Sequence, residues 1–148
     1  MSKFVYGRKG SLQAKEVPGS IDAIEELARH AQIFVVTARV SHQIRWCKEW
    51  LRKEGIDSSI HAIFSTTGKS MDGRDLTKPQ LCGDYGIHVL IDDDERHLRG
   101  PRLPKLKRIL LKSGCNEPID VPQGIALARS WRDVLRILRV ELHGRGRE

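Results

Sequence analysis

The 148-residue sequence predicts an α/β fold with a mostly parallel sheet, and two observations lead to this prediction. Short runs of β-branched and aromatic residues alternate with segments whose apolar residues recur at helical spacing. The run Gln32–Val36 is almost continuously apolar, as expected of a parallel strand covered on both faces. Hydrophobic residues make up 39% of the chain and charged residues 30%, which is typical of a globular protein. Because no linker or repeat interrupts the pattern, we expect residues 1–148 to form one domain.

The first predicted strand is Lys3–Tyr6, and the first helix follows Pro18 and Gly19. Ser20 is expected to be its N-cap, since a serine hydroxyl can accept from a free backbone N–H of the first turn. A second helix is expected over Ser41–Glu54, with Gly55 just beyond its end. Further strands are expected at Ile60–Phe64, Ile87–Ile91, Arg108–Leu111 and Ile125–Ala128, and further helices near Thr77 and after Ser130.

Composition excludes several classes of protein. No apolar stretch approaches the roughly 20 residues that span a bilayer, and the N-terminus lacks the apolar core of a signal peptide. Three cysteines without C-x-x-C spacing argue against a disulfide framework or a zinc site. We therefore expect a cytoplasmic protein with no membrane association.

The net charge of +7 is unevenly distributed. One segment contains seven Lys or Arg residues and no Asp or Glu, and such a run can contact the phosphates of a nucleic acid. A solvated surface is the favoured interpretation, because no aromatic residue interleaves the run to stack on bases. The seven residues are Arg96, Arg99, Arg102, Lys105, Lys107, Arg108 and Lys112.

Polar residues follow the predicted strands, where ligands of parallel sheets bind. Thr37 and Ala38 follow one strand, Asp92 and Asp93 follow another, and Lys78 begins a short helix. A hydroxyl, a lysine and two carboxylates at one edge suit a phosphate and Mg²⁺, a cation that takes oxygen ligands. A cation would also relieve the repulsion among neighbouring carboxylates.

In their order and spacing, the stretches 35–39 and 91–93, together with Lys78, resemble the haloacid dehalogenase superfamily of phosphohydrolases. They are most similar to small members such as the phosphatase domains of polynucleotide kinases. The resemblance implies a three-layer, Rossmann-like fold, without a large cap because the stretch 39–78 is short. It also implies site roles: Thr37, Ala38 and Lys78 would bind phosphate, with Lys69 a weaker alternative to Lys78, and Asp92 and Asp93 would hold Mg²⁺.

The sequence departs from this family at the first strand. The family has Asp-x-Asp there, with a nucleophile and a general acid/base, whereas Gly7 and Lys9 occupy these places. An aspartyl-phosphate mechanism needs a carboxylate nucleophile. We therefore expect a degenerate phosphatase, a pseudoenzyme that binds a phosphorylated small molecule, a nucleic-acid end or a partner. The alternatives are an active Mg²⁺-dependent phosphomonoesterase with an atypical nucleophile, acting on nucleotides or nucleic-acid ends, and a nucleic-acid-binding module.

Overall fold

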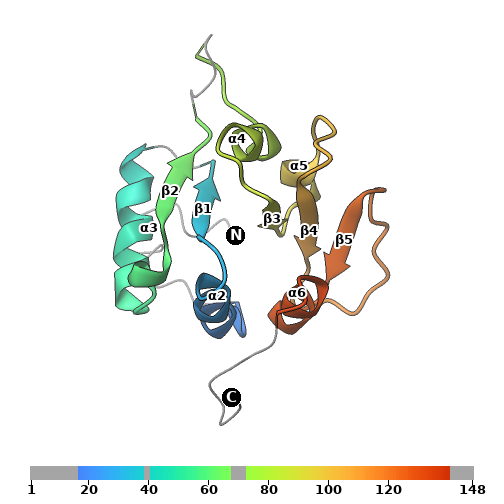
Figure 1. The fold of residues 1–148 in the computed structure, drawn as a ribbon, viewed down its shortest axis with the longest axis horizontal. Helices are drawn as coiled ribbons and strands as arrows, with labels where there is room; N and C mark the ends of the chain where they lie inside the picture. Colours follow the sequence, from blue (N-terminus) through green and yellow to red (C-terminus); the bar gives the residue numbers. More distant parts are fainter. Residues whose placement is uncertain (1–16, 39–40, 68–72, 141–148) are drawn as a thin grey trace.

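The computed structural model describes residues 17–38, 41–67 and 73–140 (Figure 1). The predicted first strand Lys3–Tyr6, the Gly7 and Lys9 positions and Lys69 therefore lie outside the described residues. The helices are α2 (Ser20–Ala28), α3 (Ser41–Lys53), the 3₁₀ turn η2 (Asp57–Ser59), α4 (Lys78–Asp84), α5 (Glu95–Leu98) and α6 (Trp131–Ile137). The strands are β1 (Phe34–Thr37), β2 (Ala62–Ser65), β3 (Val89–Asp92), β4 (Lys107–Leu111) and β5 (Ile125–Ala128).

The strands form two parallel sheets, which confirms the mixed α/β class. The first sheet pairs β1 with β2, and the second has the order β3-β4-β5. Three strands start two residues later and end one residue later than predicted, at Thr37, Ser65 and Asp92. The later ends arise because the parallel ladder continues into polar residues: Thr37 pairs with Ser65, and Asp92 with Leu110.

Helices cover both faces of the three-stranded sheet. Because successive residues of a strand point to opposite faces, Leu90 and Leu110 pack with Cys82 of α4 and Leu98 of α5. Their neighbours in the strands pack on the other face, where Ile109 contacts the cluster around Val134 of α6. Both faces are therefore buried, and α6 also contacts α2 (Figure 1).

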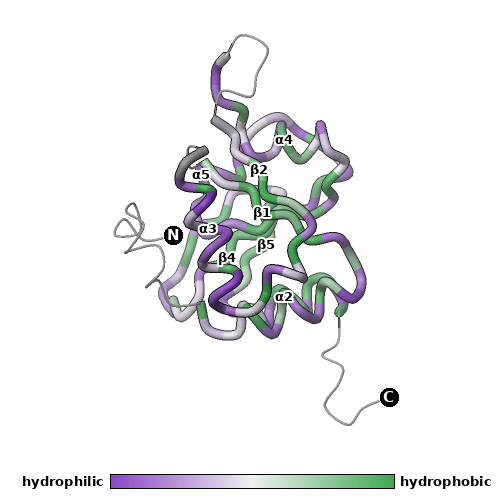
Figure 2. The backbone as a smooth tube through the Cα atoms, turned by 90° about the vertical axis from the view of Figure 1, so that its left-hand side faces the viewer, coloured by the Kyte–Doolittle hydropathy of each residue, from purple (hydrophilic) through white to green (hydrophobic). Residues whose placement is uncertain are grey.

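The β1-β2 sheet packs against α3, whose end is set by glycine. Gly55 has φ +75°, and the backbone N–H groups of Gly55 and Ile56 donate to the carbonyls of Arg52 and Leu51. This is the left-handed C-terminal turn predicted for Gly55. An aromatic stack at 4.2 Å between the Phe64 and Tyr85 rings joins β2 to the end of α4. Figure 2 shows hydrophobic segments gathered at the strands and hydrophilic stretches along α3.

Two predicted helix starts, near Thr77 and after Ser130, are confirmed, and the predicted N-cap of the first helix is wrong. The Thr77 hydroxyl accepts from the Gln80 N–H in a full capping box, and the Ser130 hydroxyl accepts from the Asp133 N–H. Ser20 is not the N-cap of α2: Gly19 occupies that position with φ +81°, and Ser20 is the buried first residue of the helix. A left-handed N-cap favours glycine, which explains why the serine lies one position later. None of the helices in the described ranges is long and apolar enough to cross a membrane.

Candidate functional site

The candidate site is an acidic turn at the carboxyl end of β3. Asp92 is the last residue of the strand, and Asp94 is the N-cap of α5. The Asp92 Oδ1 atom accepts from the Asp94 N–H at 2.9 Å, which closes the turn. Three consecutive carboxylates are thus fixed within one tight turn, so nearby cations or donors are needed to offset their repulsion.

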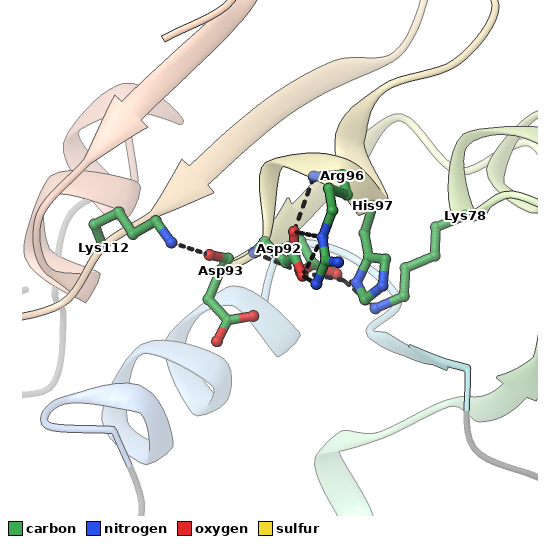
Figure 3. Close-up of polar contacts among 7 residues, drawn as sticks. Lys78, Asp92, Asp93, Arg96, His97 and Lys112 are labelled. Carbon is green, nitrogen blue, oxygen red and sulfur yellow. Dashed lines mark hydrogen bonds and ion pairs between the residues drawn. The ribbon is translucent and has the colours of Figure 1, made fainter. Parts of the chain in front are cut away.

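Lys78 supplies the cation at Asp92. Its Nζ donates to Asp92 Oδ2 at 2.5 Å, and the side chains are only 12% and 6% exposed. Lys78 is the first residue of α4, so the Thr77 capping box fixes the backbone from which it extends. His97 of α5 also approaches, with Nδ1 at 3.4 Å from Asp92 Oδ1. Figure 3 shows Lys78 and His97 reaching Asp92 from the same side. The predicted association of Lys78 with Asp92 is therefore present as a buried ion pair.

Asp94 is held by an arginine of the same turn. Its carboxylate accepts from the backbone N–H of Arg96 at 2.9 Å and from the Arg96 guanidinium at 2.6 Å. These hydrogen bonds hold the pKa of the Asp94 carboxyl far below its usual range. Arg96, which the sequence grouped with possible nucleic-acid contacts, is thus engaged within the protein.

Asp93 points elsewhere. Lys112 Nζ donates to its backbone carbonyl at 2.6 Å, and Figure 3 shows the Asp93 carboxylate directed away from Asp92. Lys112 directly follows β4, the neighbour of β3, and this placement is the signal that would have linked it to the acidic turn. Lys78 and Arg96 thus pair with the carboxylates of Asp92 and Asp94, which reduces the repulsion between them, and Lys112 binds the backbone between the two.

The loops after β1 and β2 are joined to each other. The Thr66 N–H donates to the Thr37 carbonyl at 3.0 Å, and the Thr67 hydroxyl donates to the Ala38 carbonyl at 3.1 Å. The Thr67 N–H in turn donates to the Ser65 hydroxyl at 3.1 Å. Ser65 and Thr66 are buried. These contacts hold the predicted phosphate-binding loop at Thr37 and Ala38 against its neighbour.

The strands that precede the two predicted groups of site residues line one cavity, since Val36 and Ile91 are both among its lining residues. Lys78 and Asp92 are brought into contact, whereas a role of Thr37 and Ala38 in binding phosphate stays a prediction. Within the described residues, no group of three or more His, Cys, Asp and Glu side chains could hold a metal ion. A role of Asp92 and Asp93 in holding Mg²⁺ stays a prediction, because one or two carboxylates with water and phosphate can bind this ion.

The thiol of Cys82, close to Lys78, is unreactive at neutral pH. Cys82 of α4 is fully buried, and its burial raises the pKa of the thiol to about 11, although the positive charge of Lys78 opposes the shift. The thiol form is therefore dominant at neutral pH, which argues against Cys82 as a nucleophile.

Part of the basic run is engaged by its own chain. Arg99 donates to Glu95 at 2.6 Å, and Arg108 donates to the carbonyls of Leu98 and Pro101. Together with Arg96 and Lys112, these residues tie the segment to the acidic turn and to itself. Three members of the run are exposed and have no such contact described here: Arg102, Lys105 and Lys107.

Comparisons of the chain with models of protein families, with curated proteins and with solved structures give no match. The grounds for a function are therefore the side chains at the end of β3 and the residue pattern around them.

Proposed function

We propose that the chain is a phosphatase-like protein of three-layer, haloacid dehalogenase-like architecture that binds a phosphorylated ligand without cleaving it. The observation that supports this most directly is the Lys78 ammonium, held at 2.5 Å from Asp92 at the carboxyl end of a parallel strand. A lysine at this edge of a sheet is a suitable point charge for a phosphate. The sheet covered on both faces by helices is consistent with the proposed architecture.

Phosphate would compete with Asp92 for the same ammonium. Asp92 keeps a donor without Lys78, because the Asp94 N–H still donates to its Oδ1 atom. Lys78 extends from a capped helix start, so a small rotation of its side chain can bring Nζ to an incoming anion. The ion pair therefore acts as an internal substitute for the ligand, and it lowers the apparent affinity for phosphate.

Hydrolysis is not expected, because the sequence has Gly7 where the resembled family has its nucleophile. Asp92 does not replace it, since both of its oxygens are engaged by Lys78 and by the Asp94 N–H.

A matched pair of variants tests the proposal. Asp92→Asn removes the competing carboxylate, and Asp120→Asn makes the same change of charge on an exposed loop. Inorganic phosphate binding, measured by calorimetry, should tighten about tenfold in Asp92→Asn and stay unchanged in Asp120→Asn. Lys78→Ala should abolish binding. Equal affinity in wild type and Lys78→Ala would contradict the proposal.

The same proteins separate the two alternatives. Hydrolysis of p-nitrophenyl phosphate that needs Mg²⁺ and is lost in Asp92→Asn would favour an active phosphomonoesterase. Retention of single-stranded DNA that falls steeply with salt, and is weakened by changing Arg102, Lys105 and Lys107 to Ala, would favour a nucleic-acid-binding module.

A further inference from the structure

A mostly apolar cavity of about 400 Å³ lies between the two sheets. Residues of β1 and β3 line it, and Leu27 of α2, Cys82 of α4 and Trp131 of α6 are also among its lining residues. Protein interiors contain few voids larger than a water molecule. Binding sites for small molecules typically have volumes of about 300–1,000 Å³ and mostly apolar walls, so this cavity has the size and lining of such a site.

The walls of the cavity carry no formal charge. None of the described residues that line it is Asp, Glu, Lys or Arg. Apart from the Cys82 thiol and the Trp131 indole, the polar side chains of the lining are those of Gln32 and His88, which are exposed residues. Burial raises the pKa of the Cys82 thiol to about 11, so this group is neutral at pH 7. Because an unpaired charge is costly to bury, the cavity suits a neutral molecule.

One buried donor of the lining lacks an acceptor. The Trp131 Nε1 atom is buried, and it has no hydrogen-bond partner in the described part of the chain. The ring is held in place by packing against two core clusters, one around Val134 and one around Leu27. Buried polar groups are nearly always hydrogen-bonded, and an indole nitrogen can only donate. An acceptor on a molecule in the cavity would satisfy this N–H.

We propose that the cavity binds a neutral, mostly apolar small molecule, such as an aryl ketone, whose acceptor oxygen receives the Trp131 N–H. An apolar cavity of about 150 Å³ can hold benzene, so one of about 400 Å³ has room for a ring with a substituent. Neither Lys78 nor Asp92 is a lining residue, so this site is separate from the acidic turn. The inference therefore does not rest on the proposed phosphate binding.

Three probes of similar size and shape test the chemistry of the site. Acetophenone has a ring and a carbonyl acceptor, cumene has the ring without an acceptor, and benzoate carries a charge. In NMR titrations of the full chain, acetophenone should shift the indole N–H signal of Trp131 downfield and leave those of Trp46 and Trp50, which lie on α3, in place. The Trp131→Phe variant assigns the signal. Benzoate should leave all three signals unchanged at concentrations where acetophenone saturates the site.

The same variant tests the hydrogen bond. Trp131→Phe should weaken acetophenone binding about fivefold, the effect of one neutral hydrogen bond, and change cumene binding less than about twofold. Cumene is the control for the altered shape of the cavity, because it has no acceptor to lose. Equal weakening of both probes, a shift at Trp46 or Trp50 in place of Trp131, or benzoate binding as tight as that of acetophenone would overturn the proposal.

Filling the cavity tests its position. Val35→Phe adds volume at a lining residue, and Ile63→Phe makes a similar change at its register partner in β2, which is not a lining residue. Val35→Phe should weaken both acetophenone and cumene at least tenfold, and Ile63→Phe should leave both unchanged. Equal affinities in wild type and Val35→Phe, or no binding of either probe to wild type, would also contradict the inference. Should Val35→Phe fail to fold, the Trp131 signal and the Trp131→Phe comparison decide, because neither needs added volume.

Discussion

The buried ion pair makes a quantitative prediction about Lys78→Met. This change removes the ammonium and keeps an unbranched apolar stem, so Asp92 is left 6% exposed with one oxygen unpaired. Removing one partner of a buried pair typically costs about 3–5 kcal/mol. We expect a loss near 3 kcal/mol in the free energy of unfolding, at the lower end, because the Asp94 N–H still donates to Asp92.

Urea unfolding at pH 7 measures this loss. With a slope of about 2 kcal/mol per molar urea, the midpoint should fall by roughly 1.5 M. The control is Arg99→Met, which removes the same kind of charge from the exposed i, i+4 pair with Glu95, where the arginine side chain is 62% exposed. Such a pair contributes about 0.3–0.5 kcal/mol, so the control should barely shift the midpoint. Equal, small shifts in the two variants would refute the burial of the Lys78–Asp92 pair.

Three further predictions follow from local geometry. Asp94→Ala should lower the free energy of unfolding by about 1 kcal/mol at pH 7, because the N-cap of α5 is lost. Since the pKa of Asp94 is depressed in the folded protein, this difference should persist at pH 5 and shrink only as the pH falls below about 4. Urea titrations of both proteins at each pH measure it. Gly55→Ala should destabilise the protein by about 1 kcal/mol, because Gly55 has φ +75°. Gly83→Ala should be neutral or stabilising, because Gly83 lies inside α4 at ordinary φ and its new Cβ would make only van der Waals contact. Thermal melts compare the two variants. At pH 8, a thiol reagent should modify Cys115 faster than Cys82, whose pKa is about 11, as read from labelled peptides by mass spectrometry.

The strands and helix ends were predictable because their signals are local. Apolar runs gave every described strand, and residues such as Thr77, Ser130 and Gly55 have the chemistry that their capping positions require. The exact strand ends were not predictable, because the polar residues Thr37 and Asp92 belong to their strands only through hydrogen bonding to a neighbouring strand. Gly19 is the N-cap of α2 in place of the predicted Ser20, because the backbone at this position is left-handed, which the residue types alone do not reveal.

At the site, spacing predicted which residues approach but not how they pair. Lys78 and Asp92 are far apart in sequence, and their meeting follows from parallel topology, which brings the start of α4 to the end of β3. The separate orientation of Asp93 was not predictable, because it depends on the turn that Asp92 and Asp94 close. Lys112 was interpreted as part of a solvated basic run, since its link to Asp93 requires knowing that β4 lies beside β3.

A structural role alone does not account well for the ion pair. Well-packed apolar residues often stabilise a protein as much as a buried pair or more, because the charges need not be desolvated. The Lys78→Met, Asp92→Leu double variant therefore separates two explanations. If the pair serves the fold, the double variant stays destabilised in urea. If the ammonium is kept for an incoming anion, as we propose, the double variant recovers most of the stability lost in Lys78→Met and still fails to bind inorganic phosphate.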